Sequence, residues 1–390
     1  MGNFDEILDR KNTKSVKWDM LDMVFQSEDV LPMWVADMDF RAPKEVNDAL
    51  VKRAEHGVYG YTIIDDALRN SIIDWNQSRN QWTIEPEWLS FSSGVVTSLH
   101  SAIQAFTEPN DRVLIQTPVY PPFYNVIKEH NRNIVTNPLL YNDRYYKIDF
   151  VDFEEKLKQG IRAFILCSPH NPVGRAWKRE ELEEMARLCL KYDVLIISDE
   201  IHSDLVFPDK KHIPIASLSE DVANQTITCM APSKTFNLAG LDASFVITPD
   251  EEKRKRLEIA FSKQGSHNML NTMGHTAMEA AYTHGAAWVD ELMSLMESNY
   301  QYVTESFKKH APELIVVKSE ATYLLWIDCS ELNMTSKELR AFFVNNAKVG
   351  LNSGVDYGEE AEQFMRMNIG CPRATLEEGV KRIIEAVNQR

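Results

Sequence analysis

The sequence has few cysteines, no excess of basic residues and no long hydrophobic run, and each shortage argues against a class of protein. Its five cysteines are widely spaced, with no CxxC pair. This spacing predicts buried thiols in a reducing compartment, and neither a disulfide framework nor a zinc or other metal site. The formal net charge of −16 disfavours a nucleic-acid or anionic-membrane surface, because either would need a clustered basic face.

The chain also lacks the usual signals of export and of nucleotide binding. No apolar run approaches membrane-spanning length, and the N-terminus has no apolar signal-peptide core, so we expect a cytoplasmic protein. No GxGxxG follows a strand and no GxxxxGK occurs, so neither a dinucleotide site nor a P-loop is indicated. At 390 residues the chain can bury a large core, and we expect two domains.

What is present is a regular alternation of apolar strands and helices from residue 112 to residue 248. Short apolar runs predict strands at 113–115, 163–166, 194–197, from 226 onward, and at 245–248. Such runs, separated by helices, are typical of a parallel sheet covered on both faces. Beyond about residue 285 the pattern predicts a long helix, a strand near 323–327, and helices that begin with capping boxes at Thr335 and Thr375. This pattern predicts a smaller α+β domain.

Polar side chains follow the ends of the predicted parallel strands, namely Tyr120, Asn171, Asp199, His202 and Lys234. Because these ends share one edge of a parallel sheet, the side chains can converge on a single site. Partial desolvation there would lower the pKa of Lys234 and make its amine a nucleophile or base, although a solvated surface lysine is the alternative.

A helix predicted from Val95 begins after Ser-Ser-Gly, with Ser92 or Ser93 as its cap. Free backbone N–H groups at such a start suit a phosphate, although many helices begin this way and bind nothing.

Three motifs, SPHNPVG, SDEIH and APSKTFNLAG, occur in an order and spacing that resembles the pyridoxal-phosphate enzymes of the aspartate-aminotransferase fold. PMWVADMDF, HGVYGY and NIGCPR are similar to a narrower branch, the carbon–sulfur lyases of the cystathionine β-lyase MalY/PatB type. The resemblance runs from about residue 31 to the C-terminus. It implies fold type I, with an N-terminal arm and part of the small domain at 1–45, a large cofactor domain at 46–285, and the small domain at 286–390.

The resemblance also implies roles for the residues at the strand ends. Lys234 would bind the cofactor aldehyde covalently and then move the Cα proton. Asp199 would pair with the pyridine nitrogen and Asn171 with the ring hydroxyl. His202 could approach the same oxygen, although a structural histidine is an equal alternative, and Tyr120 would stack on the ring and contact the substrate.

By the same resemblance, Gly94, Val95 and Val96 would donate backbone N–H groups to the cofactor phosphate, with help from Ser233. Tyr61 would reach the phosphate of a neighbouring subunit, which implies a homodimer with shared active sites. Two residues would bind the amino-acid substrate, Ala36 in a segment that otherwise reads as a packing loop, and Arg366. A guanidinium suits the α-carboxylate, although a surface salt bridge is the alternative for Arg366.

One position departs from the aminotransferase pattern. Many aminotransferases carry an arginine eight residues after the lysine, where this chain has Asp242. Because a carboxylate would repel the phosphate, we expect Asp242 to point away from it. Three functions then remain: β-elimination from a sulfur amino acid, which we rank first, transamination second, and a pyridoxal-phosphate-dependent transcriptional regulator. The third lacks room for a DNA-binding domain before residue 31.

Overall fold

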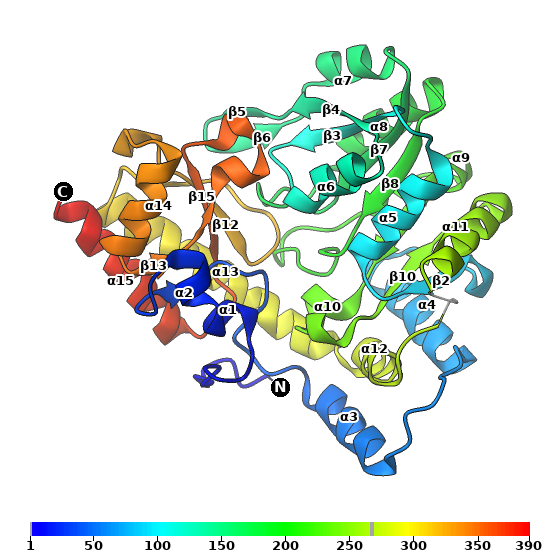
Figure 1. The fold of residues 1–390 in the computed structure, drawn as a ribbon, viewed down its shortest axis with the longest axis horizontal. Coiled ribbons are helices and arrows are strands. Elements are labelled where there is room, and N and C mark those ends of the chain that lie inside the picture. The colour runs from blue at the N-terminus through cyan, green and yellow to red at the C-terminus, as the bar shows by residue number, and fades with distance from the viewer. Residues whose placement is uncertain (1, 266–268) are drawn as a thin grey trace.

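The computed structural model describes residues 2–265 and 269–390, and a seven-stranded sheet lies at its centre (Figure 1). In spatial order its strands are β2 (Leu89–Ser92), β10 (Ser244–Ile247), β9 (Thr226–Met230), β8 (Leu195–Asp199), β7 (Ile161–Cys167), β3 (Arg112–Thr117) and β4 (Asn133–Pro138). The pairs from β9 to β4 are parallel, and β10 runs antiparallel to both of its neighbours. The predicted, mostly parallel sheet is therefore confirmed.

Both faces of this sheet are buried, as the continuous apolar strands require. Along β7, Ala163 and Ile165 face one hydrophobic cluster while Phe164 and Leu166 face another, because successive side chains of a strand alternate. The first face is covered by α5 (Val95–Phe106), α6 (Pro121–Glu129) and α11 (Glu251–Lys263). The second is covered by α7 (Phe150–Leu157), α8 (Arg179–Lys191) and α9 (Glu220–Asn224).

A second sheet of four strands is made by the C-terminal part of the chain. Its order is β11 (Ile315–Val316), β12 (Leu324–Asp328), β15 (Phe364–Asn368) and β14 (Asn352–Ser353), all antiparallel. The helices that accompany it are α13 (Ala286–His310), α14 (Ser336–Asn345) and α15 (Arg373–Asn388).

The N-terminal segment joins this C-terminal part. Strand β1 (Leu31–Pro32) pairs in parallel with β13 (Val349–Gly350), and α1 (Val16–Asp19) and α2 (Leu21–Phe25) lie beside the C-terminal elements (Figure 1). The remaining elements are α3 (Lys44–His56), α4 (Asp66–Asn80), α10 (Pro232–Thr235), α12 (Thr272–His284) and the hairpin of β5 (Leu140–Asn142) with β6 (Tyr145–Lys147). The domain boundaries at residues 45 and 285 stay a prediction.

Local predictions of helix starts were right in one place and wrong in two. The capping box at Thr335 is confirmed. The one at Thr375 is wrong, because α15 begins two residues earlier, after Pro372, whose fixed φ suits a helix start. The serine cap before Val95 is also wrong, since Gly94 is the N-cap residue and no side chain caps α5.

Two predictions about composition can be compared with the structure. All five cysteines are free and buried, as predicted. No helix in the described part of the chain is long and apolar enough to cross a membrane.

Candidate active site

A cavity of about 260 Å³ lies at the carboxyl ends of the parallel strands. Asp199 ends β8, Asn171 follows β7, Tyr120 follows β3, and Lys234 lies on α10 just after β9. All the predicted site residues except Tyr61 and Arg366 line this cavity: Ala36, Gly94, Val95, Val96, Tyr120, Asn171, Asp199, His202, Ser233 and Lys234. The structure thus brings together residues from six separate stretches of sequence.

Lys234 is partly buried, and α10 positions it by starting at Pro232 directly after the buried strand β9. Its Nζ donates a hydrogen bond to the backbone oxygen of Ala36, at 2.8 Å. Burial and, second to it, the nearby charge of Arg366 together lower the pKa of Lys234 to about 8, against the opposite effects of Asp37 and Asp199. A substantial fraction of this amine is therefore neutral near pH 8.

Asp199 is the buried carboxylate of the cavity. Among the described residues it accepts one hydrogen bond, from the backbone nitrogen of Ile201 at 3.1 Å, and it forms no ion pair. Burial and, to a smaller extent, the adjacent charge of Glu200 raise its pKa to about 7, against the lowering effects of the Ile201 hydrogen bond and of Lys234. A buried carboxylate without a cationic partner is suited to pair with a cationic group of a ligand in the cavity.

His202 and Asn171 present polar atoms at the same cavity. His202 is 4% exposed, its Nδ1 has no hydrogen-bond partner among the described residues, and burial lowers its pKa to about 3, so the ring is neutral. Asn171 accepts a hydrogen bond through Oδ1 from Arg366 Nη1, at 3.2 Å.

Arg366 lies just behind the cavity wall, on β15. It is 4% exposed and stacks over the ring of Tyr357 at 5.1 Å. Its Nη2 donates to the backbone oxygen of Trp34 (2.8 Å) and to Asn352 Oδ1 (2.9 Å), and its Nε has no partner among the described residues. A surface salt bridge is therefore the wrong interpretation of Arg366, because the side chain is buried and no carboxylate in the described chain pairs with it.

The start of α5 also forms part of the cavity wall, which Ser93, Gly94, Val95, Val96 and Thr97 line. Because no side chain caps this helix, its first N–H groups remain available to a ligand. Together with the helix dipole they make a site for an anion.

The expectation that Asp242 points away from a bound phosphate stays a prediction. Asp242 lines the cavity, because the short helix of residues 239–241 ends there with Asp242 in a left-handed conformation (φ 49°). It is also solvent-exposed, so water screens the carboxylate charge.

Tyr61 does not reach the cavity of its own chain. It is 97% exposed, in the connection between α3 and α4 at the margin of the molecule (Figure 1). Other exposed hydrophobic side chains surround it in the sequence, namely Val58, Tyr59 and Ile63.

Sequence reasoning missed several residues that support the site. Tyr323 donates through its hydroxyl to the oxygen of Ala36 at 3.1 Å, and Cys167 lines the cavity. Trp34 and Asn352 hold Arg366. A tyrosine at the start of an apolar strand carries no signal of its role, because its partner is a backbone atom 287 residues away.

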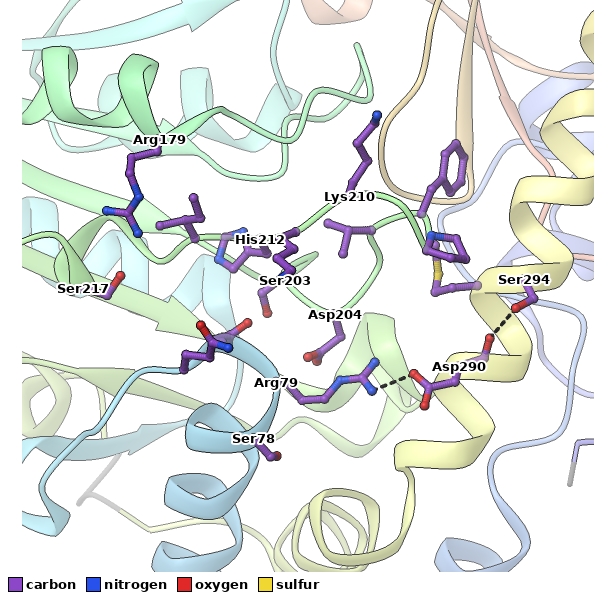
Figure 2. Close-up of a pocket in the computed structure, with 18 residues that line it drawn as sticks. Ser78, Arg79, Arg179, Ser203, Asp204, Lys210, His212, Ser217, Asp290 and Ser294 are labelled. Atoms are coloured by element: carbon purple, nitrogen blue, oxygen red, sulfur yellow. Dashed lines mark hydrogen bonds and ion pairs between the residues drawn. The ribbon is translucent and has the colours of Figure 1, made fainter.

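A second, larger cavity of about 720 Å³ lies elsewhere, with Arg79, Asp204 and His212 around it (Figure 2). None of the predicted site residues is among its described lining residues. Asp204 links it to the active site, because Asp204 accepts a hydrogen bond from Thr235, the neighbour of Lys234, at 2.8 Å.

One group of residues in the described chain has ligand atoms close enough for a metal ion, although no metal site was predicted. Asp65, His275 and Glu279 place these atoms within 4.8 Å of one another. Asp65 is exposed and Glu279 is partly exposed, and such groups are common without a metal, so the spacing alone does not indicate one.

The profile of the family named aminotransferase class I and II matches residues 28–383 of the chain. The chain belongs to this family. This member is similar to cystathionine beta-lyase PatB of Bacillus subtilis (strain 168), with 46% identity covering 99% of this chain and 100% of the relative. The resemblance that the motifs indicated is therefore confirmed.

Solved structures of related proteins agree with the fold. Cystalysin from Treponema denticola, which contains pyridoxal 5′-phosphate, is 35% identical with a TM-score of 0.96, covering 100% of this chain and 99% of its own. The pyridoxal-phosphate-bound C–S lyase from Staphylococcus hominis is 32% identical with a TM-score of 0.91, covering 99% and 98%. This family member has the predicted aspartate-aminotransferase-like fold.

Proposed function

We propose that the protein is a pyridoxal-phosphate-dependent carbon–sulfur lyase that eliminates the sulfur substituent from cystathionine or a similar thioether amino acid. The observation that carries this proposal is the cavity itself. A lysine with a pKa of about 8, a buried carboxylate without a cation and an uncapped helix start all line it. The 46% identity to a cystathionine β-lyase supports the choice of reaction.

The residues in the cavity fit the proposed cofactor. Lys234 would hold it covalently, and Asp199, which lacks a cation, would hold its protonated ring nitrogen. The side chains of Asn171 and His202 would contact the ring hydroxyl, and Tyr120 would stack on the ring. The backbone of Gly94, Val95 and Val96, with Ser233, would hold the phosphate at the start of α5. When bound, pyridoxal phosphate supplies an electron-accepting ring that stabilises negative charge at the substrate Cα.

Arg366 would bind the α-carboxylate of the substrate. Its guanidinium is buried, is fixed by Trp34 and Asn352, and has a free Nε–H. A planar guanidinium pairs with a carboxylate through two parallel hydrogen bonds. This contact would orient the Cα–H bond of the substrate. The amino group of the substrate would then lie at Lys234.

Lys234 would move the protons of the reaction. As a neutral amine it takes the proton from Cα, and as an ammonium it gives a proton to the departing sulfur. The Cα–H and Cβ–S bonds break, and the electron pair of the Cβ–S bond leaves with the sulfur. Overall, cystathionine and water give homocysteine, pyruvate and ammonia. The backbone oxygen of Ala36, 2.8 Å from Nζ, keeps the amine directed at the cavity between these steps.

The proposal includes a homodimer in the cytoplasm. The exposed hydrophobic segment around Tyr61 is suited to be covered by a second copy, with Tyr61 entering the partner's cavity beside the phosphate. The free, buried thiols suit a reducing compartment. Mixing two inactive variants, Lys234→Ala and Tyr61→Ala, should restore activity, because one cavity of each mixed dimer would then be intact.

The reaction is tested by incubation with cystathionine in the presence and absence of a 2-oxo acid. A lyase forms pyruvate and homocysteine without the acceptor and keeps its cofactor in the aldehyde form over many turnovers. An aminotransferase requires the acceptor and accumulates pyridoxamine phosphate. The second outcome would replace the lyase with transamination, the alternative that we rank below it.

A further inference from the structure

Residues 34–39 contribute Ala36 to the wall of the cavity, and side chains near the cavity hold the backbone of this segment. Lys234 and Tyr323 both donate to the oxygen of Ala36. On either side of that residue, Asn368 Nδ2 donates to the oxygens of Val35 (2.5 Å) and Asp37 (2.6 Å). The position of this wall therefore determines where the Lys234 amine lies.

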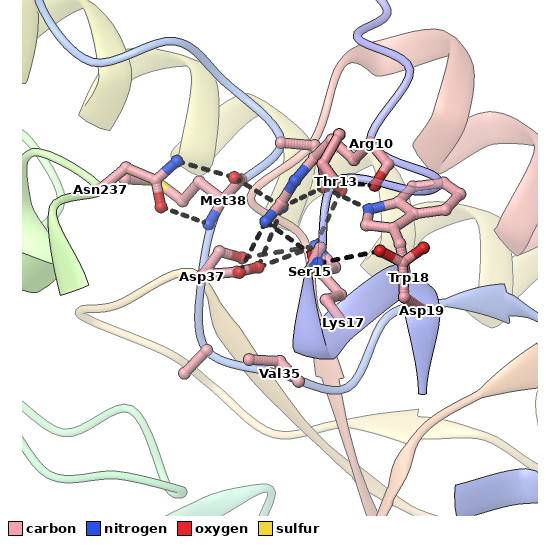
Figure 3. A network of polar contacts seen from close by, with 12 residues as sticks. Arg10, Thr13, Ser15, Lys17, Trp18, Asp19, Val35, Asp37, Met38 and Asn237 are labelled. Carbon is pink, nitrogen blue, oxygen red and sulfur yellow. Dashed lines mark hydrogen bonds and ion pairs between the residues drawn. The ribbon is translucent and has the colours of Figure 1, made fainter. Parts of the chain in front are cut away.

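The same segment is held from the outside by the arm, which we define as residues 10–19 (Figure 3). Arg10 donates to both oxygens of Asp37, at 3.1 and 2.8 Å, and to Asp39 Oδ1 at 2.7 Å. Lys17, whose side chain is 1% exposed, donates to Asp39 Oδ2 at 2.8 Å, and Trp18 Nε1 donates to Asp39 Oδ1 at 2.9 Å.

The two carboxylates of residues 34–39 are balanced by two cations of the arm. Asp37 and Asp39 each carry a negative charge, with side chains 21% and 6% exposed, and the arm supplies the two matching cations. Without the arm, two carboxylates in a poorly solvated place would stand behind a wall of the cavity. An unpaired charge there is costly and acts over a long range, because little water screens it.

We propose that Arg10 and Lys17 are positioning residues of the active site, which fix residues 34–39 over Lys234 and cancel the charge of Asp37 and Asp39 so that the α-carboxylate of the substrate can bind. This inference rests on the proposed function for its substrate. The arm thus supports Arg366, because it removes a negative field from the region where a carboxylate must enter.

Several charged or titratable groups face Lys234 from the surrounding elements: Asp37, Tyr120, Asp199, His202, Tyr323 and Arg366. Of these, Asp37 favours the protonated amine, and Arg10 pairs with it. Removing the Arg10 cation should therefore strengthen the effect of Asp37 and raise the pKa of Lys234. A smaller fraction of Lys234 would then be neutral at a given pH.

The test compares Arg10→Gln, Arg10→Gln with Asp37→Asn, and Asp37→Asn alone. The matched control is Arg41→Gln. Arg41 lies two residues after the 34–39 segment and pairs with Glu6, which lies before the arm, but Arg41 is 66% exposed and no described contact joins it to Asp37. In cofactor-free protein, labelling of Lys234 by acetic anhydride is followed by mass spectrometry against pH. In cofactor-loaded protein, KM and kcat are measured with cystathionine.

Arg10→Gln should move the labelling midpoint of Lys234 upward by about one pH unit. It should raise KM about tenfold, with a smaller change in kcat. Adding Asp37→Asn should restore most of both values, and Asp37→Asn alone should move the midpoint downward even if Arg10→Gln fails to fold. The Arg41→Gln control should match the wild type.

Two outcomes would overturn the proposal. One is a lower melting temperature for Arg10→Gln with unchanged labelling and KM, which would make the arm merely structural. The other is the absence of any rescue by Asp37→Asn. The labelling of Lys234 does not depend on lyase activity. It therefore still tests the role of Arg10 if the protein proves not to be a lyase.

Discussion

Two lysines approach residues 34–39 from opposite sides, and only one of them is arranged for chemistry. Lys17 is 1% exposed and donates to the carboxylate of Asp39 at 2.8 Å. Lys234 donates at the same distance to a neutral acceptor, the backbone oxygen of Ala36, and no carboxylate of the described residues pairs with it. Lys17 is buried and Lys234 is partly buried. The comparison shows that the partner separates a structural ammonium from a reactive amine.

The difference between the two lysines is tested most directly by replacing each of them in turn. Lys234→Ala should abolish the covalent, borohydride-reducible cofactor link and lower kcat by at least ~10²–10⁴, because proton transfer is lost with the link. Mass spectrometry after reduction should place the cofactor on Lys234 in the wild type. Finding it on another lysine would make the assignment wrong.

Arg366→Ala should lower kcat/KM for every amino-acid substrate by a similar factor, equivalent to about 2–5 kcal/mol, because a desolvated partner of the α-carboxylate is lost. Arg366→Lys is the matched control, since it keeps the charge but loses the planar fork and should recover only part of the effect. Cofactor binding, followed by absorbance, should change little. Near-normal kinetics for Arg366→Ala would exclude it from the substrate site.

Lys17→Met should keep the covalent cofactor link but destabilise the fold by about 3 kcal/mol, because Asp39 stays buried with less compensation. The measurement is denaturant unfolding, with Asp39→Asn added as the matching change. The double variant should be more stable than Lys17→Met alone. If it were less stable, the charge imbalance could not be the cause.

The smallest expected effect is a pH dependence of stability. Burial raises the pKa of Asp39, but the charges and hydrogen bonds of Lys17, Trp18 and Arg10 outweigh it and hold the pKa below 3.8. A carboxylate depressed in this way contributes stability that is fully present above pH 3.8 and is lost as pH falls through its folded-state pKa. Wild type should thus lose on the order of 1 kcal/mol more than Asp39→Asn between pH 5 and pH 3. Equal losses of stability in the wild type and in Asp39→Asn would contradict this prediction.

The sequence was most informative where chemistry coincides with strand ends. Asp199 and Lys234 follow apolar strands, so their meeting could be predicted from the rules of parallel sheets. The arm could not be found in this way, because Arg10 and Asp39 lie in segments with no periodic pattern, and their pairing depends on how the chain returns. The place of Asp242 at the cavity could not be predicted either, because a left-handed residue redirects the backbone there, which the residue type alone does not reveal.

The contacts of residues 34–39 also determine when the active site can form during synthesis of the chain. Asn368 donates to the oxygen of Val35 across 333 residues of sequence, and Arg366 to that of Trp34 across 332. The 34–39 segment is among the first to leave the ribosome, yet two of its partners, Arg366 and Asn368, are among the last. Contacts so distant in sequence form late in folding. The active site is therefore assembled only once synthesis is nearly complete, and a prematurely terminated chain would have the cofactor lysine without the wall partners and Arg366 that complete its site.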